Sequence, residues 1–72
     1  MKAQIRLDTK ESAIRLAAIA EKLDGKITIT DAAGLRVNAK SVIGVLYSME
    51  FSELWIESEN DIYSHISEFV VL

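Results

Sequence analysis

The sequence contains no cysteine, no proline and only one histidine among its 72 residues. The missing cysteines exclude disulfide bonds and thiolate metal sites, which fits a reducing compartment. A single histidine likewise excludes the usual metal site built from several imidazoles. Without such cross-links, a chain of this size depends on one small core, which rarely contributes more than about 3–5 kcal/mol. We therefore expect a single domain, residues 1–72, with no cofactor.

Basic clusters and long apolar runs are also absent. The chain has 8 lysines and arginines against 11 aspartates and glutamates, a net charge of −3, and both signs are spread along the sequence. Nucleic-acid binding calls for a basic patch, and a membrane helix needs about 20 consecutive apolar residues, so we expect neither partner. The first segment, MKAQIRLDTK, lacks the apolar centre of a signal peptide. These absences favour a soluble, cytoplasmic protein.

The spacing of apolar residues predicts a strand, a helix and a second strand in the first part of the chain. Residues 3–7 and 26–30 alternate apolar and polar side chains, which is typical of strands with one buried face. Asp8 and Glu11 have the spacing of a capping box at the start of the helix, and Gly25 can adopt the left-handed conformation at its end. The apolar stripe of this helix is Ala13, Leu16, Ala17, Ala20 and Leu23.

The second part of the chain continues the pattern. Residues 35–38 return after a turn to form a hairpin with residues 26–30. A short helix follows Ser41, a connection covers residues 48–52, and residues 53–58 form the last strand. A final helix has caps available at Ser58, Asn60 and Asp61, and its apolar positions are Ile62, Ile66, Phe69 and Val70. The predicted order is β-α-β-β-α-β-α, which belongs to the α+β class.

Each predicted strand has one apolar and one polar side, so helices should cover only one face of the sheet. The result is a two-layer, open-faced sandwich with three helices on one face. Trp55 has the polar parity of its strand and should lie on the open face, either as an exposed interface residue or covered by lysine or arginine side chains. We expect the core to contain Ile5, Leu7, Ile27, Ile29, Leu54 and Ile56 beneath Leu16, Ala20, Ile62 and Ile66.

The most specific segment is VNAKSVIGVLYS, residues 37–48. Ser41 stands where a helix N-cap belongs, and Gly44 weakens the following helix by about 1 kcal/mol relative to alanine. The segment is similar to the motif around the regulatory serine of HPr, the histidine-containing phosphocarrier protein family of the bacterial sugar phosphotransferase system. LWIESEND, residues 54–61, resembles the last strand of that family and the turn after it. The resemblance implies a four-stranded antiparallel sheet of order 1-4-2-3.

The chain departs from HPr where that family carries its phosphate. The family has a histidine at the start of its first helix, with an arginine and a proline just beyond. Here the loop is shorter, and Thr9, Lys10, Glu11 and Ser12 occupy the join. A phosphohistidine needs an imidazole and positive groups for the phosphate oxygens, whereas this join offers an acid. We therefore expect a chain that carries no phosphohistidine and is not an enzyme.

The resemblance implies a regulatory or protein-interaction module. Ser41 matches the serine that a dedicated kinase phosphorylates, and a phosphate at an N-cap is favoured by the unpaired N–H groups there. The matching family positions form an exposed apolar patch that docks partners, whereas in a small domain the same side chains can instead fill the core. In this chain the patch residues are Val42, Ile43, Leu46 and Tyr47.

Two other functions remain open. A phosphocarrier with a non-standard acceptor would use Thr9, Ser12 or His65, although Thr9 also suits a helix cap and His65 an exposed helix flank. A structural or oligomerisation domain would keep only the fold. The expected partners are proteins, namely a regulator, a kinase or a phosphotransferase component, and the expected state is a monomer or a weak homodimer.

Overall fold

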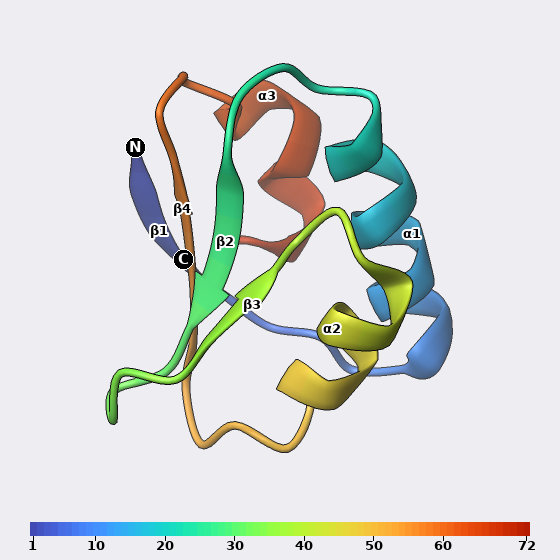
Figure 1. Cartoon of the computed structure of the whole chain (residues 1–72), viewed down its shortest axis with the longest axis vertical. Helices are drawn as coiled ribbons and strands as arrows, with labels where there is room; N and C mark the ends of the chain where they lie inside the picture. Colours follow the sequence, from blue (N-terminus) through green and yellow to red (C-terminus); the bar gives the residue numbers. More distant parts are fainter.

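The computed structural model describes residues 1–72 and follows the predicted order of elements (Figure 1). The elements are β1 (Lys2–Ile5), α1 (Lys10–Glu21), β2 (Ile27–Thr30), β3 (Arg36–Asn38), α2 (Val42–Ser48), β4 (Leu54–Ser58) and α3 (Tyr63–Ile66), with a 3₁₀ turn at Ser67–Phe69. The prediction of an α+β fold is confirmed. No helix is suited to crossing a membrane, and the longest, α1, has only 12 residues.

The four strands form one antiparallel sheet in the order β1-β4-β2-β3. The last strand in the sequence, β4, therefore lies in the interior of the sheet between β1 and β2. The helices cover one face of the sheet and leave the other face open (Figure 1). The register places Ile56 between Ala3 and Ile29, so that apolar side chains line up on the covered face. Strand order and the one-sided helix layer are both as predicted.

The core lies between the sheet and the helix layer. Every side chain predicted to form it is buried, namely Ile5, Leu7, Ile27, Ile29, Leu54, Ile56, Leu16, Ala20, Ile62 and Ile66. Ala13 and Ala17 are also fully buried, and their small side chains allow α1 to lie close to the sheet. On the open face, Thr30 is buried as well, because in the register it stands between Arg36 and Trp55.

The predicted capping box at the start of α1 is wrong. The N-cap is Thr9, whose Oγ1 accepts a hydrogen bond from the Ser12 N–H at 3.1 Å, and Asp8 instead forms an ion pair with Arg6. The helix also ends earlier than its apolar stripe, at Glu21, and the chain tightens into a turn in which the Leu23 N–H donates to the Ala20 carbonyl. Gly25 has a φ of 86°, as predicted for the residue that redirects the chain into β2.

The last helix is shorter than predicted. The Asp61 carboxylate accepts from the Tyr63 N–H at 3.0 Å at its start, and the 3₁₀ turn after it places Phe69 in the core. Val70 is then extended and forms a β-bridge with Ile5, so the prediction that Val70 belongs to the helix is wrong. Unpaired backbone groups of β1 are the physical reason, because they offer the chain hydrogen bonds after Phe69.

Candidate functional site

The start of α2 is fixed by hydrogen bonds around Ser41. Its Oγ accepts from the Gly44 N–H at 3.1 Å, and its backbone N–H donates to the Asn38 carbonyl at 3.0 Å. A Cβ on Gly44 would lie 3.2 Å from that same carbonyl oxygen, which is a tighter contact than a side chain normally makes. The predicted N-cap is therefore present, and the glycine allows the helix to pass close to the end of β3.

Lys40 does not point its charge at Ser41. Its Nζ donates to the Leu23 carbonyl at 2.7 Å, which ties the loop before α2 to the turn after α1. The Lys40 backbone N–H is also bound, by the Asn38 side-chain oxygen at 2.9 Å. A group attached to the Ser41 Oγ would thus find backbone donors nearby, while the adjacent ammonium already has a partner.

One face of α2 is exposed and largely apolar. Val42 is 42%, Ile43 80% and Tyr47 57% exposed, whereas Val45 and Ser48 on the opposite face are completely buried. Leu46 is partly buried and packs against the core, so the patch is centred on Ile43 and Tyr47 rather than on Leu46. Core filling, the other interpretation of these side chains, does not apply to Val42, Ile43 and Tyr47.

Phe51, which is partly buried against the core, adjoins this surface beyond the end of the helix. Its ring meets the ring of Tyr47 edge to face, with centroids 5.8 Å apart. Sequence reasoning missed Phe51, because it lies in the connection predicted for residues 48–52, although an aromatic pair four residues apart is a recognisable signal. We call the set Val42, Ile43, Leu46, Tyr47 and Phe51 the α2 surface.

The start of α1 offers hydroxyl groups but no imidazole. Thr9 Oγ1 and Ser12 Oγ lie 3.1 Å apart and share a hydrogen bond, and Glu11 is exposed in the first turn. The only nearby ion pair joins Arg6 and Asp8. The start of α1 therefore presents two hydroxyl groups and the Glu11 carboxylate, and the one imidazole of the chain lies on α3.

His65 lies on α3, exposed, beside a shallow groove of about 430 Å³ against α1. Arg15 and Lys22 also line the groove, but Arg15 forms an ion pair with Glu68 at 3.0 Å. The His65 imidazole takes part in no ion pair and in no side-chain hydrogen bond. A nucleophilic side chain is usually activated by a base within hydrogen-bond reach, and no such hydrogen bond is formed by His65.

Trp55 lies on the open face of the sheet and is half-buried. Lys2 Nζ stands 5.5 Å from the centre of its ring, and its Nε1 donates to a Glu53 carboxylate oxygen at 3.3 Å. The lysine contact is favourable because the face of the indole attracts a cation. The Lys2 contact agrees with the covered arrangement, while the ring also remains partly exposed on the open face.

The side chains singled out in the sequence thus fall in separate places. Ser41 and the α2 surface lie on α2 and the residues that flank it. Thr9 and Ser12 lie at the start of α1, His65 on α3 and Trp55 on the open face. No group of three or more histidine, aspartate and glutamate side chains is placed to hold a metal ion. No protein-family model, curated protein or solved structure matches the chain.

Proposed function

We propose that the chain is a regulatory protein-binding module of the HPr type, which contacts a partner protein through the α2 surface and is controlled at Ser41. The observation that carries the proposal is the exposure of Val42, Ile43 and Tyr47 on a helix of only 7 residues. Large apolar side chains grouped beside a capped serine favour a protein partner, because contact removes their surface from water. The element order and strand order also agree with those of HPr.

Phosphorylation of Ser41 would act on recognition rather than on the fold. A kinase would transfer the γ-phosphoryl group of ATP to Ser41 Oγ, with loss of the hydroxyl proton and release of ADP. The phosphate adds about −1.5 to −2 charges beside the α2 surface. Because Lys40 is already bound to the Leu23 carbonyl, the best cation for this phosphate is an arginine of the partner.

The module would bind without carrying phosphate on a histidine. HPr has its phosphorylated histidine at the start of its first helix, whereas Thr9 caps the start of α1 in this chain. The single imidazole of this chain lies on α3. Thr9 and Ser12 are occupied with each other, and no base contacts either hydroxyl. These contacts support a regulatory role over a phosphocarrier with a non-standard acceptor.

The proposal is tested by titrating the isotope-labelled chain with the HPr serine kinase and the general transfer enzyme of its native host. At least one of these two enzymes should bind and shift the amide signals of α2. The Ile43→Asp substitution should abolish the binding of that enzyme. Leu35→Asp is the matched control, because Leu35 is 50% exposed in the turn between β2 and β3, away from α2. Equal binding by both variants would contradict the proposal.

Two further measurements separate the alternatives. The kinase with ATP should phosphorylate the chain but not Ser41→Ala, and Ser41→Asp should keep the native spectrum while changing the affinity for the partner. Sedimentation distinguishes the oligomerisation alternative: a homodimer that Ile43→Asp converts to a monomer would mean that the α2 surface serves self-association.

A further inference from the structure

The two edge strands of the sheet, β1 and β3, differ in how many of their outward backbone groups form hydrogen bonds. At the β1 edge, the Arg6 N–H donates to the Phe69 carbonyl at 2.8 Å, and the Val71 N–H donates to the Gln4 carbonyl at 2.9 Å. The residues after the 3₁₀ turn therefore cover this edge. At the opposite edge, β3 (Arg36–Asn38) pairs only with β2. The chain that leads into α2 reaches its outer side at Asn38, and no strand pairs with it there.

Alternation along β3 identifies the backbone groups that are free. The Asp31 N–H donates to the Leu35 carbonyl and the Ala39 N–H donates to the Ile27 carbonyl, so the odd-numbered residues of this segment face β2. The even-numbered residues, Arg36 and Asn38, therefore direct their backbone groups outward. The Asn38 carbonyl is taken by the Ser41 N–H, which leaves both backbone groups of Arg36 and the N–H of Asn38 without partners.

Positive charge is concentrated beside this edge, in a chain of net charge −3. A groove of about 340 Å³ along β2 and β3 is lined by Lys26, Arg36 and Lys40 and by no carboxylate. Neither Lys26 nor Arg36 forms an ion pair with an acidic side chain. The edge therefore has uncompensated cations as well as unpaired backbone groups.

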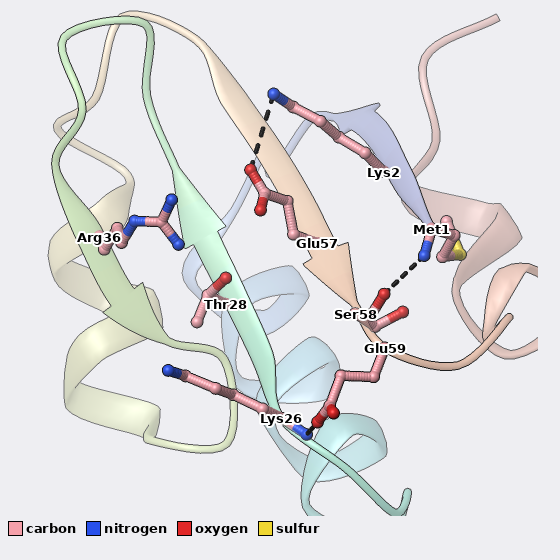
Figure 2. Close-up of a pocket in the computed structure, with 8 residues that line it drawn as sticks. All are labelled: Met1, Lys2, Lys26, Thr28, Arg36, Glu57, Ser58 and Glu59. Carbon is pink, nitrogen blue, oxygen red and sulfur yellow. Dashed lines mark hydrogen bonds and ion pairs between the residues drawn. The ribbon is translucent and has the colours of Figure 1, made fainter.

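The groove continues onto the open face of the sheet. A second hollow of about 400 Å³ shares Lys26, Thr28 and Arg36 with it and reaches Lys2 on β1 (Figure 2). Its two carboxylates are already engaged: Glu57 pairs with Lys2 at 3.6 Å, and Glu59 accepts from the Lys26 backbone N–H at 3.0 Å. The side chains of Arg36 and Lys26 are thus the charged groups that remain available to bind a ligand.

We propose that β3 is a docking edge for an extended, acidic segment of another protein, which adds to the sheet beside β3 through main-chain hydrogen bonds. Strand addition uses the free groups of Arg36 and Asn38, and acidic side chains on alternate residues of the segment pair with Arg36 and Lys26. A second copy of this chain is disfavoured, because a two-fold axis at β3 brings two positive edges together. The site is separate from the α2 surface and does not depend on the proposed function.

The test is a titration of the isotope-labelled chain with a short peptide of alternating glutamate and valine, blocked at both ends. Binding should slow hydrogen exchange at the outward amides of Arg36 and Asn38, while the amide of Val37, which faces β2, stays unchanged. The same peptide with lysine in place of glutamate should not bind. Absence of any effect with the glutamate peptide, equal binding of the lysine peptide, or changes at α2 instead of β3 would each overturn the proposal.

Variants separate the charge from the backbone contribution. Arg36→Gln should weaken binding about two- to fivefold, as expected for one surface ion pair. Lys10→Gln, which changes another exposed lysine with no ion pair, should leave binding unchanged. Arg36→Pro removes the outward N–H without touching the bonds to β2, and it should weaken binding further than Arg36→Gln. If inorganic sulfate alone reproduces the exchange pattern, the surface is a small-anion site and strand docking is wrong.

Discussion

At the residue scale, the single hydroxyl of Ser41 sets the start of α2. It satisfies the Gly44 N–H, which otherwise has no partner in the first turn of the helix. We expect Ser41→Ala to lower the free energy of unfolding by about 1 kcal/mol, measured by urea denaturation. Ser64→Ala is the control, because Ser64 is exposed on α3 and its hydroxyl makes no hydrogen bond. Equal effects of the two substitutions would contradict the assigned cap.

At Gly44, helix propensity and a close backbone contact have opposite effects on the stability of an alanine variant. Replacing glycine by alanine inside a helix normally stabilises by about 1 kcal/mol. Here the new Cβ would press on the Asn38 carbonyl oxygen at 3.2 Å, and that carbonyl is held in place by the Ser41 N–H. We expect the contact to prevail, so that Gly44→Ala lowers the melting temperature. A rise in melting temperature would show that β3 and α2 can move apart.

At the scale of the element, the two faces of α2 should respond differently to the same charge. Ile43 is 80% exposed, and Ile43→Asp should change the free energy of unfolding by no more than about 0.5 kcal/mol. Val45 is fully buried, and Val45→Asp should unfold the domain, because an unpaired carboxylate in the core is strongly unfavourable. Circular dichroism melts of both variants provide the measurement. Unfolding by Ile43→Asp would mean that the residue belongs to the core.

At the scale of the whole molecule, the fold separates the one imidazole from the start of α1. His65 lies on α3, on a different helix from Thr9 and Ser12. We expect no acid-labile label after incubation with phosphoenolpyruvate and the general transfer enzyme of the phosphotransferase system. If a label does appear, the His65→Ala variant shows where it is attached. Loss of the label in this variant would assign the phosphocarrier role to His65, and a retained label would point to another residue.

The sequence by itself determined the order of elements, the strand parity and most of the core, because each depends on local periodicity. Ala39 and Val45 are buried core residues that the pattern did not single out. Alternation in residues 26–30 and 53–58 was enough to place Ile29 and Ile56 inward and Trp55 outward. The short helix after Ser41 and its cap also followed from local pattern. The strand order came from the resemblance to HPr, since periodicity alone does not choose between neighbours in a sheet.

Only the tertiary structure decided which backbone and side-chain groups are already occupied. Asp8 and Thr9 are both suitable caps, and the choice of Thr9 accompanies the pairing of Asp8 with Arg6. Val70 has helical spacing, yet it pairs with Ile5 because β1 has a free edge. Lys40 likewise donates to the Leu23 carbonyl, which lies far from it in the sequence. The outward backbone groups of Arg36 on β3 meet no such partner. Such partners lie far apart in the chain, so no local pattern reveals which of them meet.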